Sequence, residues 1–485
     1  MTDKFVRTIL ELWGGSLFFI QGRRFIVSKR KVIIVGASHG GHQSILELLS
    51  RYGEDVEITL FEAGDYISFM SCGMELYLED QVTDVNDVRN FRPENFPEEN
   101  VHILNNHLVK AINADQKTVT VTNTLEDQTT DYAYDKLILS SGVTPNSLPV
   151  PGADLENVYL MRGYNWATKI KEKLNDPDVK HVAVIGAGYI GIEAAEAFCK
   201  AGKEIILLDM IDRPLGTYLD QEMTDILAEH LTEKGIQVMT GAKIEAFLGE
   251  GNVSAIQVNG EEIPTDLIIQ AAGVKANTEW LEGTVDLDQR GWIVTNEYLQ
   301  TNLPDVYAVG DATLAYSIPA RAKMPIALAT VARREARYVV QHLFESIPSQ
   351  PFGGVVGSSA LSVFDYHFAA SGLNSFTAGK AGVTIASAYF EDTLRPKYVP
   401  EKFGNTRVSV QLFFDPTTHQ ILGGAVLSTY DITAQGNVLA LAIQQKLTLE
   451  DLAEADFFFQ PGFDRQWSLL NLAAQHALAE KEFIE

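Results

Sequence analysis

The sequence has only two cysteines, Cys72 and Cys199, among 485 residues, and 38 basic residues against 64 acidic ones. So few cysteines exclude a disulfide scaffold and are typical of a reducing cytoplasm. The net charge of −26 repels phosphate backbones, which excludes nucleic-acid binding as the main activity. No uninterrupted apolar stretch reaches the roughly 18 residues of a membrane span. The length predicts several domains, because one hydrophobic core does not grow this large.

The first thirty residues differ from the rest of the chain. The apolar run Leu17–Ile20 is too short for the core of a secretory signal, and no small-residue cleavage site follows it. Gly22-Arg23-Arg24 fits a purine-rich ribosome-binding sequence ahead of Val27, which a GTG start codon would encode. We therefore expect residues 1–30 to be an extension that is not native coding sequence. A native but poorly ordered extension is the alternative.

Two segments share a pattern of buried strand, glycine turn, helix and second strand that ends at an acidic residue. This pattern predicts two nucleotide-binding βαβ units. Their elements are strands Val32–Val35 and Glu57–Phe61 around a helix that contains Ile45–Leu49, and strands His181–Ile185 and Glu204–Leu208 around a helix from Ile190 to Lys200. Alternating residues in 101–134 and 243–263 predict hairpin-like antiparallel strands.

The second glycine turn, Gly186-Ala187-Gly188-Tyr189-Ile190-Gly191, is a complete G-x-G-x-x-G motif between a strand and a helix. Its glycines permit a tight turn, close approach to a pyrophosphate and close helix packing. Asp209 ends the next strand, where a carboxylate accepts a hydrogen bond from the ribose 2′-hydroxyl and repels a 2′-phosphate. This unit is therefore expected to bind NADH in preference to NADPH.

The first glycine turn reads Gly36-Ala37-Ser38-His39-Gly40-Gly41, with Ser38 in place of the central glycine. Glu62 stands where the ribose carboxylate belongs, and Gly310-Asp311 ends a later strand, where Asp311 presents a carboxylate to a ligand. Two nucleotide units with a late Gly-Asp segment are typical of a flavoprotein that is reduced by a nicotinamide. We expect FAD in the first unit, with His39 facing the flavin.

Cys72 closely follows the first unit, in the segment Ser68–Met74, and we expect Ser71 and Cys72 beside the flavin. Disulfide reductases of this architecture need a second nearby cysteine, and residues 71–80 hold none. Cys199 lies in the helix of the second unit, which predicts a packing role. A solitary cysteine beside a flavin can cycle between thiolate and sulfenic acid, with peroxide as the oxidant and reduced flavin as the reductant.

Six segments, GASHGG, SFMSCGM, VIGAGYIGIEAAEAF, DRPLGTYLD, VYAVGDAT and ADFFFQPGFDRQW, resemble bacterial flavin-dependent NADH peroxidase and its sister, the water-forming NADH oxidase. The resemblance implies a homodimer or homotetramer with one FAD per chain and a C-terminal interface domain. It implies a redox cysteine at Cys72 and an active-site histidine at His39, and Tyr189 resembles the residue that shields the flavin until NADH binds. The further contacts that it implies are Glu62, Ser141, Gly142, Arg162, Asp311 and Ala329 for FAD, and Ile190, Asp209, Tyr218 and Gly273 for NADH.

The predicted fold class is α/β, with two Rossmann-like domains and a C-terminal α+β domain. The predicted divisions are an extension (1–30), an FAD-binding domain in two parts (31–142 and 271–350), an NADH-binding domain (143–270) and an interface domain (351–485).

Arg333 stands where the peroxidase-like pattern has an arginine, which would set the charge around His39. Oxidase-like sequences tend to read Asn-Ala-Val-Arg, with the arginine one residue later. Arg334 follows directly, so both alternatives stay open. The turn Ser38–Gly41 is also peroxidase-like, since oxidases often carry His-Ala-Gly, whereas Val331 replaces an asparagine expected in both.

We therefore expect a cytoplasmic NADH peroxidase that uses FAD and NADH, with no metal. Its catalytic residues would be Cys72, His39 and Arg333, with hydrogen peroxide oxidising the Cys72 thiolate. The first alternative is a water-forming NADH oxidase, with oxygen as the electron acceptor. A coenzyme A-disulfide reductase and a redox-sensing FAD protein without enzymatic activity are lesser alternatives.

Overall fold

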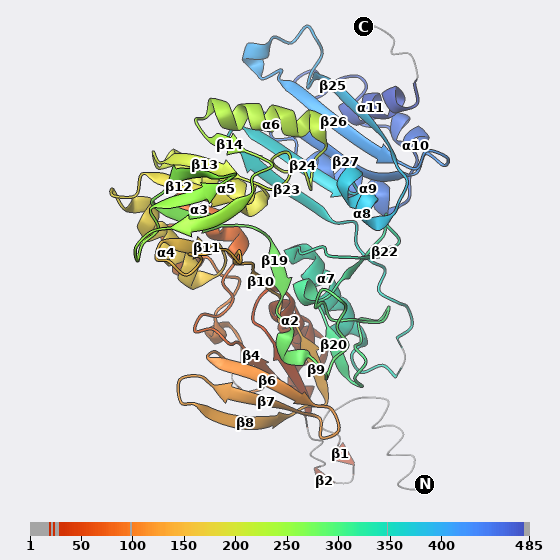
Figure 1. Cartoon of the computed structure of the whole chain (residues 1–485). Helices are drawn as coiled ribbons and strands as arrows, with labels where there is room; N and C mark the ends of the chain where they lie inside the picture. Colours follow the sequence, from red (N-terminus) through yellow and green to blue (C-terminus); the bar gives the residue numbers. More distant parts are fainter. Residues whose placement is uncertain (1–18, 21–22, 25–28, 98, 347, 480–485) are drawn as a thin grey trace.

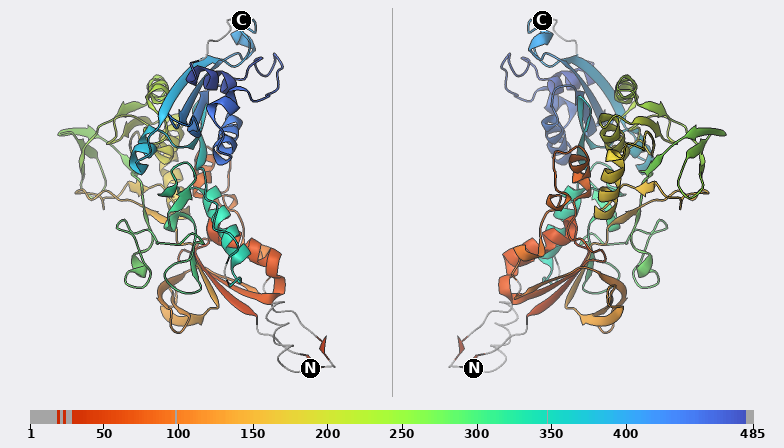
Figure 2. Two further views of the ribbon diagram at one scale, coloured as in Figure 1. Left: turned by 90° about the vertical axis from the view of Figure 1, so that its right-hand side faces the viewer. Right: turned by 90° about the vertical axis from the view of Figure 1, so that its left-hand side faces the viewer.

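The computed structural model describes residues 19–20, 23–24, 29–97, 99–346 and 348–479 (Figure 1). The molecule is elongated, with the first nucleotide domain at one end, the C-terminal domain at the other and the second nucleotide domain beside them (Figure 2). Two short strands, β1 (Phe19–Ile20) and β2 (Arg23–Arg24), pair antiparallel near the start of the chain. Val27 lies outside the described residues, so the expectation that it begins the native protein stays untested.

The first nucleotide domain is built on a parallel five-stranded sheet. In spatial order its strands are β20 (Val306–Ala308), β9 (Lys136–Leu139), β3 (Arg30–Val35), β4 (Val56–Phe61) and β5 (Val101–Leu104). Val32 and Ile34 of β3 face the helices α2 (His39–Tyr52) and α7 (Ala329–His342). Ile33 and Val35 face the opposite way, toward an antiparallel meander. The run Val32–Val35 is uniformly apolar because both faces of this strand are covered.

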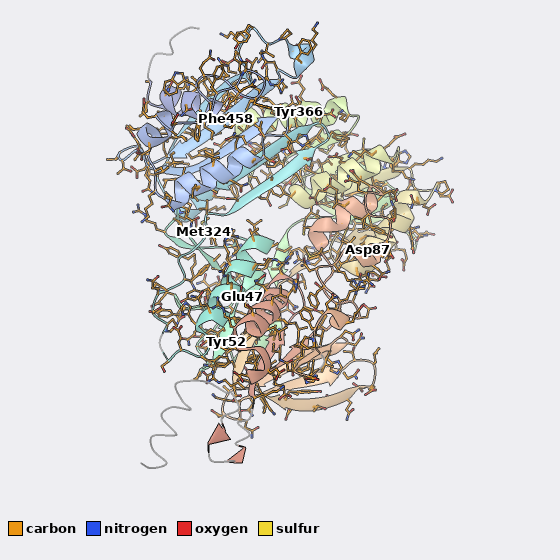
Figure 3. All side chains as sticks on the ribbon, turned by 180° about the vertical axis from the view of Figure 1, so that it is seen from behind. Glu47, Tyr52, Asp87, Met324, Tyr366 and Phe458 are labelled. Atoms are coloured by element: carbon orange, nitrogen blue, oxygen red, sulfur yellow. The ribbon has the colours of Figure 1, made fainter. Side chains whose placement is uncertain are left out.

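Helices α2 and α7 lie side by side although about 280 residues separate them in sequence (Figure 3). Tyr52 of α2 donates a hydrogen bond from its hydroxyl to the carbonyl oxygen of Val340, at 3.2 Å. Glu47 on the same helix lies 3.8 Å from the guanidinium of Arg337. The packing of α7 on α2 brings the late segment 329–342 close to the helix that the first glycine turn leads into.

One prediction for the region 101–134 is partly wrong. Residues Val101–Leu104 form β5 and pair parallel with β4, so they belong to the main sheet. Only the remainder forms the predicted antiparallel strands, which are β6 (His107–Asn113), β7 (Thr118–Asn123) and β8 (Gln128–Ala133). A strand of four residues is too short for its residue pattern to distinguish parallel from antiparallel pairing.

The second nucleotide domain repeats this plan with a parallel sheet of five strands. In spatial order they are β11 (Val158–Leu160), β18 (Leu267–Gln270), β12 (His181–Ile185), β13 (Glu204–Leu208) and β14 (Gln237–Met239). One face packs on the helices α4 (Tyr164–Asn175), α5 (Tyr189–Lys200) and α6 (Gln221–Glu233). The other face packs on the meander of β15 (Ile244–Leu248), β16 (Ala255–Val258) and β17 (Glu261–Pro264). Strands β10 (Val143–Pro145) and β19 (Val274–Ala276) pair antiparallel and connect the two domains.

The C-terminal domain has an antiparallel five-stranded sheet, as the α+β prediction requires. In spatial order its strands are β23 (Ser358–Val363), β24 (Tyr366–Gly372), β27 (Ile421–Ser428), β26 (Arg407–Phe414) and β25 (Ala386–Thr393). Helices α9 (Ala434–Gln444), α10 (Leu449–Ala453) and α11 (Leu469–Ala477) cover one face, and α8 (Ser375–Ala381) lies at its edge. Leu361, Val363 and Phe368 on the other face join the core of the second nucleotide domain. No helix in the described part of the chain is both long and apolar enough to cross a membrane.

Candidate active site

The first glycine turn leads from β3 into the N-terminus of α2. Gly36 has a φ of +102°, and a Cβ there would lie 2.2 Å from the carbonyl oxygen of Ser140. A Cβ on Gly41 would lie 2.0 Å from the carbonyl oxygen of Gly36. A Cβ on Gly40 would meet the Ser140 hydroxyl at 2.5 Å, a side-chain atom that can move. The backbone therefore requires glycine at positions 36 and 41, and the exposed Ser38 directly precedes a helix whose free N–H groups can receive a pyrophosphate.

Glu62 lies at the end of β4, beside this turn. Its Oε2 accepts a hydrogen bond from the backbone N–H of Ala37 at 3.0 Å, and its Oε1 accepts one from Gly64 at 3.0 Å. The structure thus brings the predicted ribose carboxylate to the glycine turn.

The second glycine turn has the same geometry. Gly186 also has a φ of +102°, and a Cβ on Gly191 would lie 1.7 Å from the Gly186 carbonyl oxygen. Asp209 accepts hydrogen bonds from Ala187 N–H at 2.6 Å and from Ile211 N–H at 2.9 Å. A Cβ on Gly188 would only touch the Tyr218 ring, at 3.6 Å, so the fold itself does not require glycine there. A glycine at that position instead leaves room for a ligand.

Tyr189 and Ile190 are the first two residues of α5, and both are partly buried. The Tyr189 ring stacks on Tyr218 with centroids 4.1 Å apart. Gly273, with a φ of +84°, accepts a hydrogen bond from Asn146 N–H at 3.0 Å, beside the β10–β19 connection. The predicted NADH contacts thus divide between the α5 entrance and the connection between the domains.

Cys72 lies in a short 3₁₀ turn, Ser71–Gly73, that leads into α3 (Met74–Leu78). The Ser71 hydroxyl accepts a hydrogen bond from Gly163 N–H at 3.2 Å, which ties the turn to the segment that carries Arg162. Cys72 is exposed to solvent on one side. Burial by the protein on its other sides raises the pKa of its thiol. Glu193 raises this pKa further, whereas Arg162 and Arg333 lower it.

His39 is the first residue of α2 and lies in the same electrostatic environment as Cys72. Its pKa falls to about 4 because of burial first, and because of the nearby positive charges of Arg333 and Arg162. The imidazole is therefore neutral at pH 7. Its buried Nδ1 has no hydrogen-bond partner among the described residues. Arg162 in turn lies 3.6 Å from Asp311, which brings the late Gly-Asp segment to the same place.

The two consecutive arginines of α7 point to different surroundings. Arg333 donates hydrogen bonds to Gln43 Oε1 and Asn90 Oδ1, both at 3.1 Å, and its Nη2 lies 3.3 Å from His42 Nδ1. Arg334 is exposed and donates to the carbonyl oxygen of Thr330 in its own helix, at 3.0 Å. The structure therefore places Arg333, and not Arg334, beside the glycine turn.

The remaining predicted residues lie around this centre. The Ser141 hydroxyl is buried and has no partner in the described part of the chain. Gly142 has a φ of +65° and accepts a hydrogen bond from Asn277 N–H at 3.0 Å. Ala329 is the first residue of α7, at a second helix N-terminus. Val331, which replaces the asparagine of the peroxidase- and oxidase-like patterns, packs in a small apolar cluster.

Sequence reasoning missed two buried carboxyl groups. Glu335 on α7 is fully buried and accepts a hydrogen bond from Gly310 N–H at 2.7 Å, which fixes the Gly-Asp turn. Burial raises its pKa to about 8. Glu193 on α5 also has its pKa raised to about 8 by burial, and then by Glu75 and Glu196. Glu193 stands in a mostly apolar helix, where a carboxyl group is costly to bury, and that signal could have identified it. Glu335 stands among Arg333, Arg334 and Arg337, so its sequence context gives no such signal.

Cys199 lies on α5 and donates a hydrogen bond from its thiol to the carbonyl oxygen of Lys234, at 3.4 Å. It has neighbours on two helices, as a packing residue would.

The residues fit an FAD at the first turn and a nicotinamide dinucleotide at the second. Each turn combines glycines that admit no Cβ with a helix N-terminus and an anchored carboxylate. The unpartnered polar atoms of His39 and Ser141 lie beside the first turn, where a flavin would supply hydrogen-bond partners.

Comparison with known proteins identifies the class. The sequence profile of the family "Pyridine nucleotide-disulphide oxidoreductase" matches residues 30–336, and that of its dimerisation domain matches residues 358–469. The chain belongs to this family. It is a flavoprotein oxidoreductase that uses FAD and NAD(H).

Several known proteins resemble the chain over most of its length. An NADH oxidase of Enterococcus faecalis is 38% identical over 450 residues, which cover 92% of this chain and 99% of that protein. The structure of a water-forming NADH oxidase from Lactobacillus brevis bound to NADH superposes with a TM-score of 0.88 at 35% identity, and the match covers 93% of this chain and 98% of that one. A coenzyme A disulfide reductase of Staphylococcus haemolyticus is 27% identical, and the match covers 92% of this chain and 99% of that protein.

Proposed function

We propose that this flavoprotein is an NADH peroxidase that reduces hydrogen peroxide to water at Cys72. The observation that carries the proposal is the orientation of the two arginines on α7. Arg333, which matches the peroxidase-like pattern, contacts His42 of α2, three residues after His39, whereas Arg334, one residue later, faces outward. This orientation supports the peroxidase-like pattern, in which the arginine stands at position 333.

The chain's own residues supply the chemistry of the first half of the cycle. The positive charges of Arg333 and Arg162 favour the thiolate form of Cys72 against the effect of burial. The thiolate attacks one oxygen of peroxide: an S–O bond forms, the O–O bond breaks, and the second oxygen leaves as hydroxide and takes a proton to become water. His39 is neutral, so its ring has one donor and one acceptor nitrogen, which suits a ligand such as peroxide that both donates and accepts. Cys72 ends this half as a sulfenic acid.

FAD held at the first glycine turn would supply two electrons, received from NADH as hydride. With them, and a proton, the S–O bond of the sulfenic acid breaks, a second water leaves, and the Cys72 thiolate is restored. The overall reaction converts NADH, one proton and hydrogen peroxide into NAD⁺ and two waters. Asp209 is proposed to hold the adenosine ribose of NADH, and Glu62 that of FAD.

An anaerobic assay tests the proposal. NADH oxidation should begin only when hydrogen peroxide is added, with one NADH consumed per peroxide. Cys72→Ser should abolish this turnover and still bind FAD, because Cys72 makes no side-chain hydrogen bond that the fold needs in the described structure. Cys199→Ser is the matched control and should keep the activity. An undiminished Cys72→Ser enzyme would refute the role of the cysteine.

The names of the relatives favour a second candidate, a water-forming NADH oxidase. In that case reduced flavin would react with oxygen, and the peroxide formed would be reduced at Cys72 in the same way. Rapid aerobic NADH loss without added peroxide would support the oxidase and refute the peroxidase. Steady NADH oxidation with coenzyme A disulfide would instead indicate the third activity found among the relatives.

We also propose a cytoplasmic location, where NADH is supplied and both cysteines stay reduced. The match to a dimerisation domain supports a homo-oligomer, with the C-terminal domain at the interface.

A further inference from the structure

A hairpin of the C-terminal domain lies against the entrance of the second nucleotide domain. Strand β23 is the edge strand of its sheet, and β24 follows it after a tight turn. Leu361 and Val363 of β23 are buried in the same core as Phe198 of α5. Ser359 is on the same face of β23, nearer the start of the strand, because side chains alternate along a strand. The hairpin therefore presents Ser359 toward the N-terminal end of α5.

Ser359 meets Tyr189 there. The two hydroxyl oxygens are 2.7 Å apart, and either can be the donor. The Tyr189 ring also packs edge-on against Phe368 of β24, with centroids 5.6 Å apart, and stacks on Tyr218 on the other side. Burial raises the pKa of the Tyr189 phenol above its usual value. Two of these three contacts come from the C-terminal domain, so that domain, and not α5 alone, sets the position of the ring.

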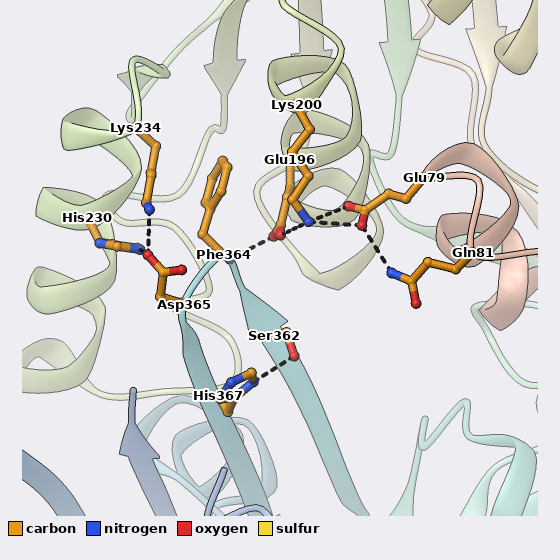
Figure 4. Close-up of polar contacts among 10 residues, drawn as sticks. All are labelled: Glu79, Gln81, Glu196, Lys200, His230, Lys234, Ser362, Phe364, Asp365 and His367. Atoms are coloured by element: carbon orange, nitrogen blue, oxygen red, sulfur yellow. Dashed lines mark hydrogen bonds and ion pairs between the residues drawn. The ribbon is translucent and has the colours of Figure 1, made fainter. Parts of the chain in front are cut away.

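The hairpin turn is fixed on the second nucleotide domain (Figure 4). The backbone N–H of Phe364 donates to Glu196 Oε2 at 2.8 Å, and Lys200 bridges Glu196 to Glu79. Asp365 pairs with Lys234 of the second domain. Phe364 has a φ of +52°, a conformation that a bulky residue keeps only where surrounding contacts enforce it. Because the turn is anchored to α5 and to Lys234, the residue directly after α6, β23 is held in place and Ser359 stays opposite Tyr189.

We propose that Ser359 is a positioning residue that holds Tyr189 closed over the nicotinamide path, so that NADH must break the Ser359–Tyr189 hydrogen bond to bind. The proposal rests on NADH binding at the second glycine turn. Tyr189 is the first residue of α5, where the pyrophosphate of the dinucleotide lands, and its ring stacks with Tyr218 beside Gly188. The Tyr218 ring lies 3.6 Å from where a Cβ on Gly188 would stand, and the Tyr189 ring stacks on it, so the two rings occupy space beside the turn that a bound dinucleotide needs. The apparent affinity for NADH then equals the intrinsic affinity of the open form multiplied by the fraction of molecules in which the Tyr189 ring is open.

Removing the hydroxyl should therefore tighten NADH binding. A net hydrogen bond of ordinary strength corresponds to a change in affinity of about three- to tenfold. The test compares Ser359→Ala with the FAD-loaded wild-type protein. Affinity is measured by calorimetric titration with NAD⁺, and flavin reduction by NADH is followed by its absorbance in anaerobic stopped flow. We expect about three- to tenfold tighter NAD⁺ binding and a half-saturating NADH concentration lowered by the same factor. The limiting rate of flavin reduction should stay unchanged.

Ser362→Ala is the matched control. Ser362 is on the same strand, but its side chain faces solvent and bonds to His367 Nδ1 at 2.9 Å (Figure 4). Ser359→Thr keeps a hydroxyl and should restore the wild-type affinity. Tyr189→Phe removes the same bond from the other side, so the double variant with Ser359→Ala should bind no more tightly than either single variant.

Unchanged or weaker NAD⁺ binding in Ser359→Ala, relative to Ser362→Ala, would overturn the proposal. Additive effects of the two single variants would overturn it as well. Both measurements omit peroxide and oxygen, so they do not depend on which electron acceptor is correct. Failure of the peroxidase assignment would instead appear as the absence of peroxide-dependent turnover in the wild-type enzyme.

Discussion

The two glycine turns have nearly the same backbone and very different surroundings. Gly36 and Gly186 share a φ of +102°, and in each turn a carboxylate accepts a hydrogen bond from the next residue's N–H. The two sheets also place corresponding strands in the same order, although the strand at one edge, β20, comes late in the chain while its counterpart, β11, comes early. The shared part is thus a device for holding a dinucleotide.

The difference lies in the residue that opens each helix. His39 opens α2 and lies among positive charges, from Arg333 and Arg162. Tyr189 opens α5 and lies among aromatic rings, with the carboxyl group of Glu193 nearby. The same backbone position is therefore surrounded by cations in one domain and by aromatic rings in the other. The motif thus supplies the binding geometry, and the packed neighbours set the electrostatics around each turn.

The largest expected effect comes from adding a methyl group to either turn. In Gly191→Ala the new Cβ would lie 1.7 Å from a backbone oxygen, so we expect flavin reduction by NADH to fall about 100-fold or more with FAD content unchanged. In Gly41→Ala, where that distance is 2.0 Å, FAD itself should be lost. Flavin absorbance per chain and anaerobic stopped flow measure the two outcomes. Gly379→Ala, on α8 with open space around it, is the control. Loss of FAD in both variants would contradict the assignment of a different cofactor to each turn.

The second effect separates the two arginines. Arg333→Gln removes a cation beside Cys72 and His39, and we expect peroxide turnover to fall on the order of 100-fold. Arg334→Gln changes an exposed side chain and should stay within about twofold of wild type. Steady-state kinetics with peroxide measures both. Equal losses in the two variants would remove the observation that supports the peroxidase assignment.

The third effect tests the carboxylate of the second turn. Asp209→Asn keeps one of the two oxygens that accept backbone hydrogen bonds and removes the charge that repels a 2′-phosphate. We expect the preference for NADH over NADPH, measured as the ratio of kcat/KM values, to fall about tenfold. Glu62→Asn in the first turn should leave this ratio unchanged. If the ratio of kcat/KM values for NADH and NADPH were also unchanged in Asp209→Asn, the Asp209 carboxylate would not distinguish the two nucleotides.

The smallest effect is a pH dependence of the first turn. The pKa of His39 is lowered from 6.5 to about 4, so between these values the unfolded chain binds a proton that the folded chain does not. Stability should therefore fall as pH drops from about 6.5 toward 4. His42, whose pKa is also about 4, contributes with the same sign. Burial is the larger cause of both shifts and Arg333 the next, so Arg333→Gln should raise both pKa values part of the way toward 6.5 and weaken this dependence in part. Urea unfolding at pH 5 and pH 7 measures the change, and an unaltered pH dependence in the variant would contradict the assigned cause.

Much of the fold could be predicted because its signals are local. The strands His181–Ile185 and Glu204–Leu208 have the predicted bounds, since a buried strand shows as an uninterrupted apolar run and ends at a turn. The two glycine turns could be predicted as well, because each has glycines at a fixed spacing directly after such a strand. Residues Val101–Leu104 were assigned to a hairpin because nothing in four residues specifies a partner strand.

The two dinucleotide motifs, their carboxylates and the isolation of Cys72 are evident from the amino-acid sequence, because each depends on residue types at fixed local spacing. Which arginine faces α2 depends on packing, since consecutive residues on a helix point about 100° apart and the neighbouring elements select the inward one. Only the tertiary structure brought Ser359 to Tyr189, 170 residues apart in sequence. Contacts between distant segments arise from the packing of whole domains, and no local pattern encodes them.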